Sequence, residues 1–403
     1  MATKIIEFDT LSMPDLPEEG WPGYSSVLVL FKRGRRTLNA QRLPLAGGQI
    51  DDFEFDRAAA NALRHRHDLL VRERFAGSQI EDSPPISVSV VICSRDRAAQ
   101  LDRCLAALAA CDPQPMEILV VDNATADDST ARMAEQHGVR CEREDRPGLN
   151  WARARGAAAA RGEIVAYIDD DVVVTSGWLT PFARRFGDPS LAGLTGLVMP
   201  YRLDDRASEM FENYCGFVRG YQHRTFTLSS IKPMGAANIG AGACMAFRRD
   251  IVNDLRLFNV ELDAGTATRT GGDTYAFYRL ITLGYRIDYD PDVVVRHQHR
   301  DSEDAVVSTL RDYSVGTYVF FLHCFLRHRE SHALMAGMRW FRSHHLRQLT
   351  GGLLGRPRAQ PLRMTLAEIR GCFAAPLAYL KARLNDRRHT PPTDDPVKAK
   401  ASA

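Results

Sequence analysis

Between residues 86 and 168 the sequence alternates short apolar runs with amphipathic stretches, and this alternation limits the fold more than any other feature. Three runs have the continuous apolar character of strands buried on both faces: ISVSVVI (86–92), MEILVV (116–121) and EIVAYI (163–168). The stretches between them have leucines at helical spacing, acidic starts or glycine stops, at 98–110, 127–138 and 149–162. VRCERE (139–144) adds a short strand. The pattern predicts an α/β fold with a mostly parallel central sheet and helices on both faces.

The rest of the chain divides around this core. Near the N-terminus, SSVLVLF and RTLNAQRLPL read as two strands that turn at Gly34, and a helix is expected over 56–75. EDSPP (81–85) then interrupts regular structure. We therefore expect four parts: a β-rich accessory region (1–82), the α/β domain (83–301), a helical extension (302–388) and a disordered tail (389–403).

Composition argues against several classes of protein. A net charge of +2 over 403 residues does not favour nucleic acid as a partner. The eight cysteines form no CxxC pair, which argues against structural zinc and favours a reduced, cytoplasmic protein. The sequence shows no signal peptide and no run of 18 apolar residues. Neither a GxGxxG fingerprint nor a P-loop follows the predicted strands.

Three adjacent aspartates follow the strand EIVAYI. Asp169, Asp170 and Asp171 come at its carboxyl end, the edge at which open α/β sheets bind ligands. Because side chains alternate along an extended backbone, Asp169 and Asp171 should face one cleft while Asp170 faces away. Two convergent carboxylates suit a hard divalent cation, Mg²⁺ or Mn²⁺. A solvated turn or a helix cap would explain the same residues.

Polar residues also end the first two strands, in CSRDR (93–97) and DNATADD (122–128). Asp122 closes an apolar strand, where its carboxylate could accept a hydrogen bond from a base or a ribose. Without a P-loop, bound phosphates would be neutralised by the cation and by arginines such as Arg95, Arg153 or Arg155. Taken alone, each arginine reads more readily as half of a surface ion pair.

The ordered combination VSVVICSRDRAAQLDRCLAAL, EILVVDNATADDST and RPGLNWARARGAAAARGEIVAYIDDD resembles the inverting glycosyltransferases of family 2. That family has the GT-A (Rossmann-like) fold and uses nucleotide sugars, and the resemblance runs from about residue 87 to 299. It implies that Cys93, Ser94 and Arg95 line the nucleotide pocket and that Asp122 contacts the base. Relatives often have proline at position 93 and asparagine near position 96, where this chain has cysteine and aspartate.

The resemblance assigns further roles around the aspartates. Arg153 would lie near the nucleotide. Asp169 would approach the ribose or the metal, and Asp170 would belong to the nucleotide-sugar contacts. Asp171 would bind the metal that bridges the diphosphate.

Residues 263–300 resemble the acceptor half of the same family. Asp273 stands at the position of the catalytic base, which removes the proton of the acceptor hydroxyl as its oxygen attacks the anomeric carbon opposite the departing diphosphate. One such displacement inverts the anomeric configuration. Relatives often have an acidic residue just before this aspartate. Here it is Gly272, which we assign with Asn238 to the acceptor side. Asp273 would also serve as an N-cap for the helix that follows.

A histidine after the apolar strand DVVVR completes the implied site. Many relatives place a histidine at the position of His297, near the metal and the diphosphate, and His299 is its local rival. The small residues of GAANIGAGACMAF would let the backbone approach an acceptor near Asn238, or would pack as a tight strand. Trp178 is expected in the core.

The helical extension after Ser302 is basic. From residue 311 to 403, 16 lysines and arginines face 6 aspartates and glutamates. Helices with apolar and basic faces would lie in a membrane interface or pack back on the catalytic domain, and the sequence leaves both alternatives open. The histidines in this region lack a zinc-type arrangement and read as surface residues: 323, 328, 332, 344 and 345.

These patterns predict a metal-dependent inverting glycosyltransferase. It would move a sugar from a nucleoside diphosphate sugar, of uridine or deoxythymidine type, to a hydroxyl acceptor on a glycan, a lipid or a small molecule. The first alternative is a nucleotidyltransferase acting on sugar phosphates, although CSRDRAAQ lacks the glycines of the usual loop. The second is a non-catalytic nucleotide-sugar-binding protein. We expect a cytoplasmic location, or a peripheral one at the inner face of the membrane.

Overall fold

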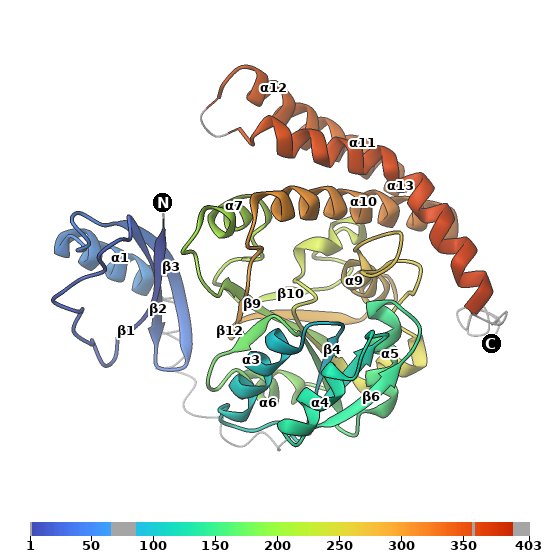
Figure 1. Cartoon of the computed structure of the whole chain (residues 1–403), viewed down its shortest axis with the longest axis horizontal. Coiled ribbons are helices and arrows are strands. Elements are labelled where there is room, and N and C mark those ends of the chain that lie inside the picture. Colours follow the sequence, from blue (N-terminus) through green and yellow to red (C-terminus); the bar gives the residue numbers. More distant parts are fainter. Residues whose placement is uncertain (1, 66–85, 357–358, 390–403) are drawn as a thin grey trace.

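The computed structural model describes residues 2–65, 86–356 and 359–389. A small three-stranded sheet lies at one side of a central α/β domain, and a layer of long helices covers the domain (Figure 1). The predicted boundary at 81–85, the second half of the helix expected over 56–75 and nearly all of the tail 389–403 lie outside the described residues.

The predicted alternation of strands and helices is confirmed between residues 88 and 169. The elements are β4 (Val88–Ser94), α3 (Ala98–Ala109), β5 (Glu117–Asn123), α4 (Ser129–Gln136), β6 (Arg140–Glu144), α5 (Leu149–Ala159) and β7 (Ile164–Asp169). β4 pairs in parallel with both β5 and β7, so it lies inside the sheet. Its Val90, Val91 and Ile92 are fully buried because helices cover both faces.

The sheet continues beyond β7 into the second half of the domain. Among the described residues it has nine strands, in the order β10-β12-β9-β11-β7-β4-β5-β6, with β8 paired to β12. Six strands (β4, β5, β6, β7, β9 and β12) run in one direction, which confirms a mostly parallel sheet. The added strands are β8 (Val172–Val174), β9 (Leu191–Pro200), β10 (Arg224–Phe226), β11 (Cys244–Arg248) and β12 (Arg286–His297).

Short helices join these added strands and cover their ends. They are α6 (Thr180–Phe186), α7 (Arg206–Cys215), the 3-10 helix η1 (Pro233–Asn238), α8 (Arg249–Leu255) and α9 (Gly272–Thr282). β11 runs antiparallel between β7 and β9. β7 is therefore an inner strand of the sheet, with a neighbouring strand on each side.

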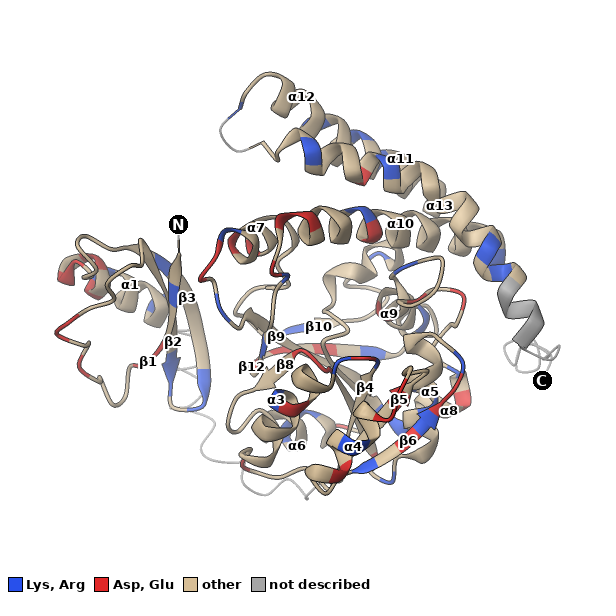
Figure 2. Ribbon diagram, in the orientation of Figure 1, with Lys and Arg blue, Asp and Glu red and all other residues tan. Residues whose placement is uncertain are grey.

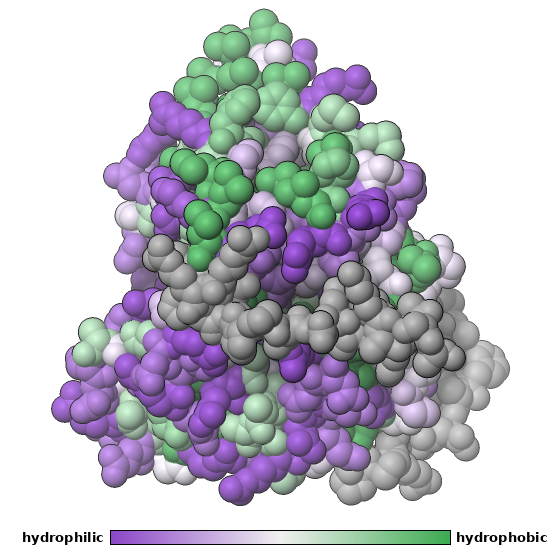
Figure 3. All heavy atoms as spheres, turned by 90° about the vertical axis from the view of Figure 1, so that its right-hand side faces the viewer, coloured by the Kyte–Doolittle hydropathy of each residue, from purple (hydrophilic) through white to green (hydrophobic). Residues whose placement is uncertain are grey.

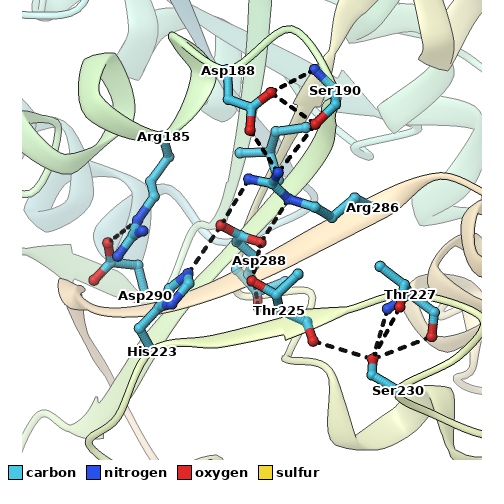
Figure 4. Close-up of polar contacts among 12 residues, drawn as sticks. Arg185, Asp188, Ser190, His223, Thr225, Thr227, Ser230, Arg286, Asp288 and Asp290 are labelled. Carbon is cyan, nitrogen blue, oxygen red and sulfur yellow. Dashed lines mark hydrogen bonds and ion pairs between the residues drawn. The ribbon is translucent and has the colours of Figure 1, made fainter.

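Buried polar contacts hold β10 against β12. Asp288 is almost fully buried and accepts hydrogen bonds from His223 Nε2 (3.0 Å), Thr225 Oγ1 (3.0 Å) and Arg286 Nε (3.2 Å), as Figure 4 shows. Burial alone would raise the pKa of Asp288, but His223 and Arg286 hold that pKa below its usual value. A paired charge therefore adds to the apolar packing that fixes this end of the domain.

The N-terminal part has its own core. The two predicted strands are confirmed as β2 (Ser26–Arg33) and β3 (Arg36–Pro44), and α1 (Asp52–His65) begins four residues before the expected helix. A third strand, β1 (Thr3–Asp9), was not predicted and pairs in parallel with β2. The rings of Phe8, Phe31 and Phe55 meet between this sheet and α1. The buried Asp292 of β12 accepts a hydrogen bond from the Thr37 amide (2.8 Å) and links the two parts.

Long helices form the C-terminal layer. They are α10 (Glu303–His328), α11 (Ser331–Trp340), the π-helix η2 (Phe341–Leu346), α12 (Arg347–Leu353) and α13 (Leu362–His389). α10 packs on α7 and lies under α11 and α13 (Figure 1). Gly371 of α13 sits against the carbonyl oxygen of Arg311 in α10, where a β-carbon would not fit. Within the described ranges, no helix is long and apolar enough to span a membrane.

The reading of all five extension histidines as surface residues is wrong for two of them. His323 and His345 are almost fully buried, because α13 packs over them. His345 lies between Cys372 Sγ (3.3 Å) and the carboxylate of Glu368 (3.7 Å), and His344 approaches the same carboxylate (3.3 Å). Burial alone would lower the pKa of His345, but these two partners raise that pKa to about 9. An ion-paired network therefore joins η2 to α13.

Substituting Gly196 tests how closely the added strands pack. A β-carbon at Gly196 of β9 would collide with the carbonyl oxygen of Val293 and lie 2.7 Å from Cys244 Sγ. We expect Gly196→Ala to lower the free energy of unfolding by about 1–3 kcal/mol. At Gly235 the same change meets ordinary contacts of 3.6 Å or more, so Gly235→Ala should stay within about 0.5 kcal/mol. Urea unfolding of both variants measures the difference, and equal stabilities would contradict the packing described.

Candidate active site

The three aspartates lie at the carboxyl end of β7 and divide as expected. Asp169 is the last residue of β7, and Asp170 and Asp171 form the turn into β8. Ligand atoms of Asp169, Asp171 and His297 all lie within 4.8 Å of one another, and Asp170 is outside this group. His297 is the last residue of β12, the strand that pairs with β8. The turn therefore brings two carboxylates and one imidazole together.

Asp170 points toward the loop after β4. It is buried and accepts hydrogen bonds from Ser94 Oγ (2.8 Å) and Arg97 Nη1 (3.1 Å). Arg97 also lies 3.3 Å from Asp171 Oδ2. Asp170 thus fixes the loop that carries the predicted nucleotide residues. The sequence analysis missed Arg97, whose signal was its place in CSRDR beside the strand end.

The group formed by Asp169, Asp171 and His297 fits a divalent cation. Asp171 Oδ1 and His297 Nδ1 are buried without a hydrogen-bond partner, and His297 Nε2 lies 3.3 Å from Asp171 Oδ1. Burial lowers the pKa of His297 to about 3, so the ring is neutral and has a lone pair free to coordinate. His299 differs, because its Nε2 lies 2.9 Å from Glu212 Oε2. Of the two rival histidines, only His297 faces the aspartates.

Charge is not fully compensated at this turn. Loss of contact with water, together with the neighbouring charge of Asp171, raises the pKa of Asp169 and of Asp170 to about 6. The arginines that oppose this effect are Arg97, Arg153 at 3.8 Å from Asp169, and Arg300 at 4.0 Å from Asp171. A cation would stabilise the ionised carboxylates that these arginines stabilise only in part.

The predicted nucleotide residues lie along the ends of β4 and β5. Cys93 and Ser94 pair in register with Val121 and Asp122. Asp122 is buried, and one carboxylate oxygen accepts from Arg143 Nη1 (2.5 Å) while the other has no partner. Asp122 therefore keeps one buried carboxylate oxygen without a hydrogen-bond partner.

The loop after β4 explains one departure from the family pattern. Asp96 has a positive φ of 55°, a conformation that asparagine and aspartate tolerate better than most residues. Its Oδ1 accepts from the Ala126 amide (3.0 Å), which ties this loop to the loop after β5. Arg95 is exposed, with its Nε 3.6 Å from the carboxylate of Asp96. Aspartate can therefore serve where relatives have asparagine.

Arg153 connects the aspartate turn to Asp273. It is buried in α5, with Nη2 3.8 Å from Asp169 Oδ1. A β-carbon at Gly242 would lie 2.8 Å from Arg153 Nη2 and 3.1 Å from Asp273 Oδ2, so the three residues are adjacent. The Gly242 amide donates to Asp273 Oδ2 (2.8 Å). The side chain of Arg153 is therefore next to both Asp169 and Asp273.

The start of α9 differs from the expected N-cap. Gly271 precedes the helix, so Asp273 is its second residue and not its cap. Its Oδ1 accepts from the Thr274 amide (2.7 Å). Gly272 is buried against the side-chain amide of Asn150, which occupies the space that a β-carbon would need. This contact explains why the acidic neighbour found in relatives is absent, and the sequence analysis did not identify Asn150.

Other predicted residues lie farther from this group. Asn238 is exposed at the end of η1, and its amide donates to the Gly235 carbonyl (3.2 Å). Arg155 pairs with Glu142 (2.7 Å) in a surface ion pair. Trp178 is fully buried, as expected of a core residue.

Comparison with known proteins finds similarity over the central part of the chain. The model of the family described as "Glycosyl transferase family 2" matches residues 89–256. A pre-mycofactocin glycosyltransferase of Mycobacterium tuberculosis is 27% identical over 224 residues, which cover 53% of this chain and 43% of that protein. A glucosyl-dolichyl phosphate glucuronosyltransferase of Haloferax volcanii is 25% identical over 175 residues, which cover 41% of this chain and 54% of that protein. The chain therefore spans about half the length of these curated relatives.

One solved structure is also similar. It is the mannosyltransferase PcManGT from Pyrobaculum calidifontis in complex with GDP-Man and Mn²⁺, with a TM-score of 0.47 and 19% identity over 80% of this chain and 98% of that one. The matched family segment contains β4 to β7 and the aspartate turn that follows them. This central segment of the chain is therefore similar to glycosyltransferase family 2.

Proposed function

We propose that this protein transfers a sugar from a nucleoside diphosphate sugar to a hydroxyl group, with inversion at the anomeric carbon. The observation that carries the proposal is the junction at Arg153 and Gly242. There the group of Asp169, Asp171 and His297 lies next to a separate carboxylate, Asp273. An inverting transferase needs these two sites side by side, one for the leaving diphosphate and one for the attacking hydroxyl.

Asp273 is the proposed general base. The Gly242 amide holds one of its oxygens, and the Thr274 amide holds the other, so the carboxylate has one orientation. A positioned carboxylate removes the hydroxyl proton as the oxygen attacks. In this proposal the base and the leaving diphosphate lie on opposite sides of the anomeric carbon, and Arg153 lies next to both Asp169 and Asp273.

The donor side is proposed to lie along β4, β5 and β7. Asp171 and His297 would hold Mg²⁺ or Mn²⁺, with Asp169 beside them. When bound, such a cation stabilises the negative charge that grows on the departing diphosphate. The unpartnered oxygen of Asp122 would accept from a uridine or deoxythymidine base, and Cys93, Ser94, Arg95 and Asp170 would line or support this pocket.

The acceptor remains open among glycans, lipid-linked sugars and small molecules. The exposed Asn238 of η1 is proposed to contact it, since η1 packs on α9, which carries Asp273. One relative is named for action on glucosyl-dolichyl phosphate, a lipid-linked sugar, which supports that class for this chain. The basic C-terminal helices would then meet the membrane that carries the lipid.

Asp273→Asn separates base catalysis from binding. We expect kcat to fall by about 10²–10⁴-fold while the KM for the donor stays nearly constant, because the amide keeps the shape but cannot take the proton. Release of nucleoside diphosphate from a panel of nucleotide sugars with Mn²⁺ and an acceptor measures the rate. Asp254→Asn, the same change at an exposed position of α8, is the matched control.

Two outcomes would contradict this assignment. Full activity of Asp273→Asn would show that Asp273 is not the general base. NMR of the product gives its anomeric configuration. A linkage that retains the configuration of the donor would contradict the single-displacement mechanism. A wild-type protein that binds donor yet never releases diphosphate would favour the binding-protein alternative.

The metal assignment can be tested without turnover. We expect Asp171→Asn and His297→Ala each to raise the dissociation constant for Mn²⁺ by at least about tenfold, since changes even in outer-shell partners cost that much in other sites. Electron paramagnetic resonance of free Mn²⁺ in a protein titration gives the constant. His299→Gln is the control two residues away, because His299 pairs with Glu212 and should leave the constant within about twofold. Equal losses in all three variants would contradict the assignment.

A further inference from the structure

The C-terminal hairpin, defined as α11, η2, α12 and α13 up to Leu384, exposes an unusual amount of apolar surface. More than half of the exposed large apolar side chains in the described part of the chain belong to it. Figure 3 shows such residues gathered over the helices at the top of the molecule. The members are Leu334, Met335, Met338, Trp340, Leu346, Leu353, Leu354, Leu362, Leu366, Phe373, Leu377, Leu380 and Leu384.

The apolar residues of α13 form a single stripe. At 100° per residue, the six exposed leucine and phenylalanine positions from 362 to 384 fall within an arc of about 60°. The opposite face of the helix is already used, because Met364, Ala375 and Tyr379 are buried against the rest of the protein. α13 is therefore apolar on two sides and has a protein partner on one of them. An uncovered stripe of this length marks a binding surface.

The charge that the hairpin's own residues place around this stripe is almost entirely positive. Between residues 331 and 384 the sequence has nine arginines and lysines, and its only acidic residue is Glu368. Glu368 is buried with His344 and His345, so it offers no negative charge to the outside. Arg370 and Lys381 border the stripe on α13 and are exposed, whereas Arg363, which also borders it, is paired with Asp304 of α10. Figure 2 shows the same predominance of blue on these helices.

We propose that the C-terminal hairpin docks on the surface of an anionic lipid bilayer, with its apolar side chains among the outer acyl chains and its arginines and lysines at the headgroups. Helices that lie in an interface combine an apolar face with basic residues and often a tryptophan, here Trp340. A second copy of the chain fits less well, because a two-fold contact would bring two cationic rims together.

The docking surface also indicates where an acceptor would come from. α11 packs on η1, and η1 packs on α9, which carries Asp273. One short helix thus connects the membrane-facing layer with the proposed base. Resting on the proposed function, the inference therefore extends to the acceptor, which we assign to a sugar carried by a membrane lipid.

Vesicle co-sedimentation tests the docking independently of catalysis. The full chain is mixed with vesicles of phosphatidylcholine alone or with about 30% phosphatidylglycerol, at about 0.1 M and 0.5 M NaCl. We expect binding to anionic vesicles at low salt, with at least tenfold weaker binding to neutral ones. Phe373→Gln/Leu380→Gln should lose binding at least about tenfold. Leu11→Gln/Phe53→Gln alters two residues of the N-terminal part with nearly the same exposure (58% and 73%, against 74% and 58%) and should bind as the wild type does.

Each outcome decides the proposal. Wild type left in the supernatant with both kinds of vesicle would overturn it, as would a hairpin variant that binds like the wild type. A wild type that dimerises in solution, does not bind vesicles and becomes monomeric in the hairpin variant would assign the surface to a second copy.

An activity measurement then tests the acceptor. Transfer to a sugar on a vesicle-embedded lipid should exceed transfer to the same sugar on a short, water-soluble chain. The hairpin variant should lose that excess while its release of diphosphate with the water-soluble acceptor stays the same. Equal rates with both acceptors would overturn the lipid acceptor. If no form of the protein releases diphosphate, the proposed function fails, and vesicle binding still decides the docking.

Discussion

The structure depends on placing three adjacent carboxylates at the end of a buried strand. Like charges so close together must be compensated, and the compensation comes from distant parts of the chain. Arg97 approaches from the loop after β4, Arg153 from α5 and Arg300 from the segment after β12. Each of these arginines belongs to a different part of the fold. The need to compensate the three carboxylates therefore brings the loop after β4, α5 and the segment after β12 together at the end of β7. The compensation is incomplete, since the pKa values of Asp169 and Asp170 stay raised, and a divalent cation would supply the rest.

Close backbone approach is the second requirement of the site. Gly242 lets Arg153 and Asp273 lie against one strand end, and Gly272 lets the side chain of Asn150 lie under the start of α9. A β-carbon at Gly242 would crowd Arg153 and Asp273, and one at Gly272 would displace the side chain of Asn150. Gly272 and Asn150 are therefore complementary, because the asparagine side chain occupies the space that the glycine leaves open. Relatives often have an acidic residue at the position of Gly272, and here the side chain of Asn150 occupies the space beside it.

The sequence predicted the elements whose signal is local and missed those that depend on distant partners. β4, β5 and β7 are buried on both faces, so each shows an unbroken apolar run. β1 has no such run, because most of its side chains are only partly buried. Arg97 reads like any charged loop residue until Asp170 and Asp171, more than 70 positions later, fold against it. In the sequence His345 looks like a surface residue, because the helix that buries it, α13, comes later in the chain and leaves no local signal at His345.

The same reasoning applies to the C-terminal layer. A helix of a globular domain needs one apolar face, and the buried face of α13 meets that need by packing on α10. Its second apolar stripe does not add to the folding of the described chain, since no other element covers it. Exposure to water carries a free-energy cost for such a stripe, and selection for folding alone would favour polar residues there. The stripe and its cationic border are therefore best explained by a surface outside the chain, one that is apolar at depth and negative at its boundary.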